Sequence, residues 1–280
     1  MNVLWKCLLL ACVVGGAILW VRAGQGEPGS PDGRSSATGN QHTLDLKPAP
    51  RMPLPTDDRP YHGVAWQIHS THDIINISRT ILGEIADLGA DTVLISNAGY
   101  QEHAGSDSFQ IDPKVTPSPA EWQQIFDIAH QNGLRVILMP IILLSNPRGN
   151  EWRGQIQPPN WDDWFEQYSR FLNHFARIAE AGKVEVLSVG SELVSTERYV
   201  DKWRRVIREV RQVYSGKLTY SANWDHYKVV EFWDDLDLVG MTSYYKLSNT
   251  PNPSLDTLLE AWKPIKRGLL KWQEEIGKPL

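Results

Sequence analysis

The chain has 280 residues, with 28 basic and 33 acidic side chains, and its net charge at pH 7 is −5. This balance gives no clustered basic face of the kind that binds a phosphate backbone, which argues against a nucleic-acid partner. Both cysteines, Cys7 and Cys12, lie near the N-terminus, and the eight His are scattered. Without thiolate pairs or an HExxH spacing, the sequence predicts neither a metal site nor a cofactor.

Residues 1–23 have the composition of a targeting segment. The apolar run Cys7–Val21 has the length of a signal-peptide hydrophobic region and is near the lower limit for a membrane-spanning helix. Three alternatives stay open: a signal peptide cleaved after Ala23, an uncleaved membrane tether through residues 3–21, and a lipoprotein signal at Cys12. All three predict an extracytoplasmic protein that is secreted, periplasmic or membrane-anchored.

Residues 24–60 are rich in Gly, Pro, Ser and Asp and show no apolar periodicity. This composition is typical of a flexible linker without a core of its own. A regular pattern begins at Tyr61, so we expect one folded domain over residues 61–280.

Short apolar runs alternate with amphipathic segments along this domain. Strands are expected at Gly63–Ile68, Thr92–Ser96, Arg135–Pro140, Val184–Val189, Leu218–Ala222 and Leu238–Thr242. Helices are expected at Ile75–Leu88, Pro119–Gln131, Trp161–Ala181, Val200–Tyr214, Val229–Trp233 and Leu255–Ile276. Six such units predict an α/β fold, either a parallel barrel or a doubly wound sheet. Because no Gly-rich turn follows the first strand, a nucleotide-binding Rossmann fold is disfavoured.

Polar and aromatic side chains gather just after the predicted strand ends: Trp66, Asn97, Glu192, Asn223, Trp224, Tyr244 and Tyr245. In a (β/α)₈ barrel the carboxyl ends of the strands form the active-site face. The 12 Trp of the chain could build an aromatic core or line a cleft. The clustering at the strand ends favours the cleft.

Glu192 follows the fourth predicted strand directly, in the run Gly190-Ser191-Glu192-Leu193. Neighbouring aromatic side chains would shield a carboxyl group at this position, and a low dielectric favours the protonated form that a general acid needs. The alternative is a Glu at a helix N-terminus, where it interacts favourably with the helix dipole. The residues alone leave both interpretations open.

A set of longer motifs resembles a known family. They are Trp152-Arg153-Gly154-x-Ile156-x-Pro158, Trp161-x-x-Trp164-Phe165-x-x-Tyr168, Val189–Leu193, Tyr220–Trp224, Asp237–Met241 and Tyr244-Tyr245. Over about Gly63 to Leu280 the chain resembles glycoside hydrolase family 113, β-mannanases of the clan of retaining (β/α)₈ glycosidases. The resemblance implies a TIM barrel that hydrolyses a β-linked, mannan-like polysaccharide or oligosaccharide without a cofactor.

The resemblance also implies roles for individual residues. Glu192 matches the acid/base at the end of the fourth strand, in a mechanism that uses two carboxylates about 5–5.5 Å apart. For Trp66 and Asn97 the likeness is weaker, and packing or capping is the alternative. The full set expected to bind the sugar is Trp66, Asn97, Trp152, Arg153, Asn223, Trp224, Tyr244 and Tyr245.

The folded part is shorter than a complete barrel of roughly 250 residues. In this clan the nucleophilic Glu follows the seventh strand, and Ile276–Leu280 reads as the entry into that strand. We therefore expect an incomplete barrel of about six βα units, with bare edges on its first and sixth strands and little or no activity. Other acids near the rim, Glu102, Glu197 and Asp225, are expected to be solvated at the surface.

Two other functions stay open. The first is a non-catalytic, extracytoplasmic carbohydrate-binding relic that keeps the aromatic cleft without a nucleophile. The second is an extracytoplasmic α/β protein in which Glu192 is structural. A Glu at a strand end in the reading frame beyond Leu280 would favour the enzyme over the relic. Mannan binding retained by Glu192→Gln but lost in Trp224→Ala would argue against a structural Glu192.

Overall fold

The structure is a computed structural model that describes residues 59–280, so the predictions for residues 1–58 lie outside the described range. Within this range there are six parallel strands: β1 (Gly63–Ile68), β2 (Thr92–Gln101), β3 (Arg135–Leu144), β4 (Val186–Ser191), β5 (Lys217–Asn223) and β6 (Leu238–Thr242). The α-helices are α1 (Ile74–Asp87), α2 (Pro119–Gln131), α3 (Trp161–Ala181), α4 (Val200–Arg211) and α5 (Leu255–Ile276). None of the helices in residues 59–280 is long and apolar enough to cross a membrane.

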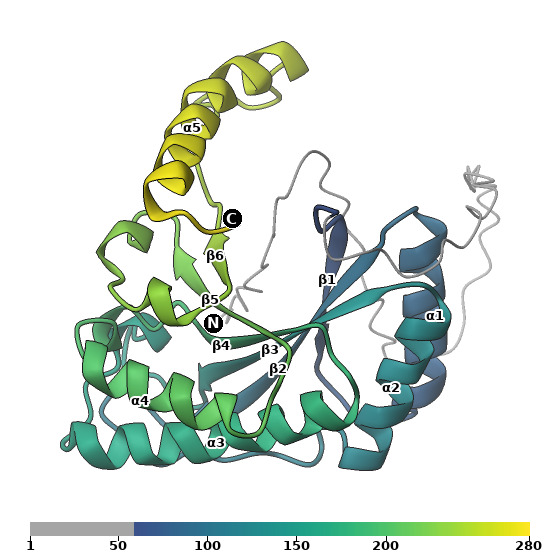
Figure 1. Ribbon diagram of the computed structural model, residues 1–280, viewed down its shortest axis with the longest axis vertical. Coiled ribbons are helices and arrows are strands. Elements are labelled where there is room, and N and C mark those ends of the chain that lie inside the picture. The colour runs from purple at the N-terminus through teal and green to yellow at the C-terminus, as the bar shows by residue number, and fades with distance from the viewer. Residues whose placement is uncertain (1–58) are drawn as a thin grey trace, which may run out of the picture.

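The sheet, in the order β1-β2-β3-β4-β5-β6, curls into an open half-barrel (Figure 1). Helices α1 to α4 cover its outer face, and α5 extends away from the β6 side. The main core lies between the sheet and these helices. A second buried cluster lies on the inner face and comes from alternate positions of β2 and β3: Leu94, Ala98, Tyr100, Met139, Ile141 and Leu143. The predicted fold, an incomplete (β/α)₈ TIM barrel, is confirmed.

Two local predictions differ from the structure. β2 continues five residues and β3 four residues beyond the predicted strands. β3 continues past Pro140, and in β2, Asn97 and Gly99, which resemble turn residues, lie inside a regular strand. Gly99 is needed there, since a Cβ would lie 2.3 Å from the ring of Phe171 on α3. The predicted helix over Val229–Trp233 is wrong, and two separate 3-10 turns, Tyr227–Val229 and Trp233–Asp235, occupy that region instead.

β1 and β6 are the two edges of the described sheet. On the free side of β6, the backbone N–H of Val239 donates to the carbonyl oxygen of Pro279 at 2.8 Å. The last residues of the chain therefore lie beside β6, in the place that the next strand takes in a parallel barrel. The β6 edge, predicted to be bare, is covered at this one point.

The tryptophans of the described chain divide between core and surface. Trp122, Trp164 and Trp203 are fully buried between the sheet and the helices. Trp152 and Trp224 are 37% and 36% exposed; Trp152 lies in the loop after β3, and Trp224 directly follows β5. The three buried rings are part of an ordinary aromatic core, whereas a place in a sugar-binding cleft stays a prediction for the two exposed rings.

Candidate active site

Glu192 lies immediately after β4, and the residue is 5% exposed. One carboxylate oxygen accepts a hydrogen bond of 2.5 Å from the Arg153 guanidinium, and the other accepts one of 2.7 Å from the Thr242 hydroxyl at the end of β6. Arg153 is equally buried, and its Nε–H donates to the Ser191 carbonyl oxygen at 3.0 Å. A buried charge requires a counter-charge and hydrogen bonds. Arg153 supplies both to the Glu192 carboxylate, and Thr242 supplies a further hydrogen bond.

The backbone around Glu192 is irregular. The register between β4 and β5 shifts between Ser188 and Ser191, and Glu192 has a φ of 55°, in the left-handed region. Such a shift bends a strand and redirects the side chains that follow it. Gly190 permits the close packing behind the turn, because a Cβ there would lie 2.8 Å from the ring of Tyr220. The irregularity brings the carboxylate of Glu192 to β6.

Arg153 begins a 3-10 turn in the loop after β3. The carboxylate of Glu151 anchors this loop, because it accepts hydrogen bonds from the backbone N–H groups of Arg148 and Ala104 at 2.9 and 3.2 Å. The Trp152 ring lies over Gly154, where an added Cβ would be 2.3 Å from it. The loop that was predicted to bind substrate therefore supplies Arg153, the ion-pair partner of Glu192. It also supplies the exposed ring of Trp152, the residue before Arg153.

A second group of predicted residues follows β5 and β6. The rings of Trp224 and Tyr245 meet edge to face with 5.1 Å between their centroids, and Tyr244 is exposed. Asn223 is joined to the Glu192 site, since its side-chain oxygen lies 3.4 Å from the Thr242 hydroxyl. Burial, with smaller effects from Tyr227 and Asp225, raises the pKa of Tyr245 to about 12. Tyr245 therefore stays protonated at neutral pH.

Trp66 and Asn97 make contacts typical of residues that stabilise the fold. Trp66 is half-buried and packs against the main core. Asn97 is inaccessible to solvent, and its amide donates to the Val115 carbonyl oxygen at 2.7 Å. These contacts agree with the packing and capping alternative, and a role of either residue in sugar binding stays a prediction.

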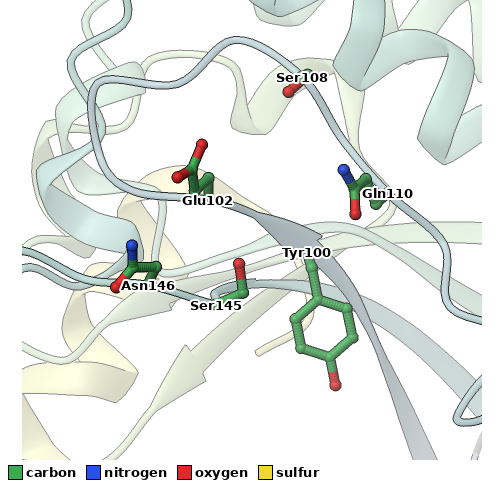
Figure 2. A pocket seen from close by; sticks show the side chains of 6 residues that line it. All are labelled: Tyr100, Glu102, Ser108, Gln110, Ser145 and Asn146. Atoms are coloured by element: carbon green, nitrogen blue, oxygen red, sulfur yellow. The ribbon is translucent and has the colours of Figure 1, made fainter.

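A polar cavity of about 350 Å³ lies where β2 and β3 end; its lining residues are Tyr100, Glu102, Ser108, Gln110, Ser145 and Asn146 (Figure 2). Backbone hydrogen bonds fix its walls: Ser145 donates to Gln101, Asn146 donates to Glu102, and Tyr100 and Gln110 exchange a pair. Hydroxyl, amide and carboxylate groups of this kind are those that hydrogen-bond sugar hydroxyls. Apart from Glu102, which was considered as a rim acid, sequence reasoning missed this cavity.

Of the three other rim acids, Glu102 and Asp225 are exposed, as expected, but Glu197 is 2% exposed. The prediction that Glu197 is solvated is therefore wrong. Its carboxylate accepts from the Tyr220 hydroxyl at 2.7 Å and contacts Nδ1 of His226 at 2.6 Å. Burial raises the pKa of Glu197, and the hydrogen bonds from Tyr220 and His226 offset this only in part.

This raised pKa predicts a pH-dependent stability. Below the ordinary value of 4.5 the group favours folding, and that contribution is lost as the pH rises through the pKa of the folded state. We expect the unfolding free energy of the parent, relative to that of Glu197→Gln, to decrease from pH 4.5 to neutral pH. Urea unfolding at several pH values measures this difference. A difference that is flat with pH would contradict the prediction.

The arrangement places a buried, ion-paired carboxylate at the strand ends, and acid/base chemistry at Glu192 stays a prediction. Within residues 59–280 no group of three or more His, Cys, Asp and Glu side chains is placed to hold a metal ion. Thr242 was missed as a site residue, although it ends the sixth predicted strand. Since the carboxyl ends of parallel strands meet at the same rim, this position was the available signal.

The comparisons with known proteins agree on one family. The model of Glycoside Hydrolase Family 113 matches residues 68–280. The GH113 β-mannanase AaManA from Alicyclobacillus acidocaldarius, solved in complex with ManMIm, is 28% identical with a TM-score of 0.69, over 80% of this chain and 70% of that one. A complex structure of a GH113 β-1,4-mannanase is also 28% identical, with a TM-score of 0.62 over 75% of this chain and 69% of that one. No curated protein matches.

The family match covers nearly all of the described residues, and it includes Glu192, Arg153 and Thr242. The fold match to solved members is an independent finding that agrees with it. The chain therefore belongs to glycoside hydrolase family 113 and is a glycoside hydrolase.

Proposed function

We propose that the protein is an exported, retaining hydrolase of a β-linked, mannan-type polysaccharide, with Glu192 as its acid/base. The observation that carries this proposal is the position of Glu192, a buried carboxylate at the rim of the half-barrel held by Arg153 and Thr242. The sugar class is supported by the two 28% identical structures, both β-mannanases by their description. The N-terminal apolar run supports the export.

In this mechanism Glu192 gives its proton to the glycosidic oxygen while the bond between that oxygen and the anomeric carbon breaks. A second carboxylate attacks the anomeric carbon and forms a covalent glycosyl-enzyme. Glu192, now deprotonated, takes a proton from the water that releases the sugar. Arg153 and Thr242 hold the carboxylate in place for both steps.

The second carboxylate is proposed to lie beyond Leu280, in a seventh strand. Pro279 already lies beside β6, where such a strand would begin. Glu197 is engaged with Tyr220 and His226, while Glu102 lines the polar cavity. Within residues 59–280 the carboxylate of Glu192 itself is hydrogen-bonded to Arg153 and Thr242.

Trp224→Ala is expected to weaken the binding of β-1,4-mannotetraose about tenfold, which corresponds to about 1.4 kcal/mol. The exposed face of the Trp224 ring provides the flat apolar surface against which a sugar ring packs. Isothermal titration calorimetry on the 280-residue protein measures the effect. Leu259→Ala is the matched control, because Leu259 is an exposed apolar residue on α5.

The same titration with cellotetraose and xylotetraose tests the sugar class. Tighter binding of mannotetraose is the expected result. If none of the three sugars binds, the proposed function is wrong for this chain. Binding of mannotetraose without any cleavage chemistry would support the carbohydrate-binding relic instead.

A further inference from the structure

The conformation of Glu192 requires an explanation, because its φ of 55° is unusual for a residue with a side chain. A left-handed backbone conformation is unfavourable for a non-glycine residue and persists only where its surroundings fix it. The contacts of its carboxylate with Arg153 and Thr242 fix the tip of the side chain. The backbone that follows must be held by other groups.

The next backbone N–H, that of Leu193, donates to the hydroxyl of Tyr220 on β5 at 3.0 Å. That hydroxyl in turn donates to one oxygen of the Glu197 carboxylate at 2.7 Å. All three residues are buried. Burial and the negative charge of Glu197 raise the pKa of Tyr220 well above 10, so the phenol keeps its proton. Its single proton points to Glu197, which leaves its lone pairs for Leu193.

The other oxygen of Glu197 contacts Nδ1 of His226 at 2.6 Å. His226 lies two residues after Trp224, and its backbone N–H donates to the carbonyl oxygen of Asn223 at 2.9 Å. One buried carboxylate is thus linked through the Tyr220 hydroxyl to the turn that carries Glu192, and it contacts His226 directly in the turn that carries Trp224. A carboxylate suits this place because both of its oxygens accept hydrogen bonds.

We propose that Glu197 is a positioning residue, which sets Glu192 through Tyr220 and sets Trp224 through His226. The inference rests on the proposed function, in which Glu192 is the acid/base and Trp224 contacts the sugar. An apolar side chain could fill this buried position without a desolvated charge, whereas Glu197 carries one that burial disfavours. Such an unfavourable group is typical of a functional site rather than of a packing position.

NMR of the 280-residue protein tests the two arms separately. The Arg153 Nε–H resonance reports on the turn at Glu192, because that group donates to the Ser191 carbonyl oxygen. The Trp224 indole N–H resonance reports on the other turn. We expect Tyr220→Phe to shift the Arg153 signal and leave the Trp224 signal, and His226→Ala to do the reverse.

Variants of Glu197 complete the test. Glu197→Leu is expected to shift both signals and to weaken mannotetraose binding about tenfold. In Glu197→Gln both signals are expected to stay at their positions in the parent. The amide oxygen accepts from Tyr220, and the amide nitrogen donates to Nδ1 of His226. Tyr214→Phe is the control, since it removes another buried hydroxyl, one that donates to the Val184 carbonyl oxygen at 2.8 Å.

A purely structural Glu197 would give another pattern. Tyr220→Phe and Glu197→Leu would then lower the melting temperature as Tyr214→Phe does, while the Arg153 and Trp224 signals stayed in place. That result would overturn the proposal. The two NMR signals are recorded without sugar. If the protein binds no mannotetraose, the proposed function is refuted, but the spectra still decide whether Glu197 positions the two turns.

Discussion

Azide is expected to start the cleavage of phenyl β-mannotrioside by the 280-residue protein. In the proposed mechanism the described residues supply the acid/base, Glu192, and the nucleophile lies beyond Leu280. Azide can take the nucleophile's place: its nitrogen bonds to the anomeric carbon, the bond to the phenolic oxygen breaks, and Glu192 protonates that oxygen. The reaction is a single displacement, so the product is the α-configured mannotriosyl azide, identified by its NMR spectrum.

Glu192→Gln is the matched variant, because glutamine keeps the shape of the side chain and cannot donate the acid proton. We expect the azide-dependent rate to fall by about 10²–10⁴, the usual contribution of general acid catalysis. Trp224→Ala should lower the apparent affinity for the substrate more than the rate at saturation. If the azide-dependent rate of Glu192→Gln equalled that of the parent, Glu192 would not be the general acid.

The configuration of the products also tests the location of the nucleophile. Free mannotriose released with retention and without azide would place a working nucleophile inside residues 1–280 and contradict its proposed position. Mannotetraose binding without cleavage, with or without azide, would identify a carbohydrate-binding relic.

The fold was predictable because apolar periodicity reports directly on the faces that a parallel sheet buries. The same regularity placed Glu192 and Asn223 at one rim, since the carboxyl ends of parallel strands meet there. Thr242, at the end of the sixth predicted strand, was not singled out. The ion pair between Arg153 and Glu192 was not predictable. It joins residues 39 positions apart, and no local pattern connects a loop after β3 to a turn after β4.

Glu197 shows most clearly where local patterns fail. It follows a 3-10 turn, Val194–Thr196, which is too short to show the periodicity that distinguishes buried from exposed positions. Its neighbours in sequence, Ser195 and Arg198, are polar, so the segment resembles a solvated loop. Its partners Tyr220 and His226 come from β5 and the turn that follows, and only the folded chain brings them together.

Asp91→Asn is expected to destabilise the protein by about 3–5 kcal/mol, because it leaves a buried guanidinium without its counter-charge. Asp91 precedes β2 at the amino ends of the strands. Its Oδ1 accepts hydrogen bonds from Arg135 at 2.8 Å, from the Thr92 hydroxyl at 2.6 Å and from the backbone N–H of His62 at 3.0 Å. Arg135 is 2% exposed. Urea unfolding at neutral pH measures the loss.

Asp162→Asn is the control for this variant. Asp162 pairs with Lys202 at the surface, and exposed pairs contribute only about 0–1 kcal/mol. If Asp91→Asn were no more destabilising than Asp162→Asn, Arg135 would have to be satisfied by its other acceptors, the carbonyl oxygens of Arg59 and Pro60.

The pH dependence gives a second check on Asp91. Burial alone would raise the pKa of its carboxyl, but hydrogen bonds from Thr92, Arg135 and His62, with the charge of Arg135, hold that pKa below its ordinary value of 3.8. A lowered pKa stabilises the fold above the ordinary value, and the contribution is lost as the pH falls through the folded pKa. The parent should therefore lose more stability on acidification than Asp91→Asn does, and this sign is opposite to that expected for Glu197.

The two buried arginine–carboxylate pairs within residues 59–280 thus lead to opposite expectations for substrate binding. Asp91 and Arg135 lie at the amino ends of the strands, where barrels concentrate stability, while Glu192 and Arg153 lie at the carboxyl ends, where barrels concentrate chemistry. Under conditions where Asp91→Asn is folded, its affinity for mannotetraose should equal that of the parent. Arg153→Met, by contrast, should weaken binding even where the protein stays folded, because it frees the carboxylate that the substrate meets.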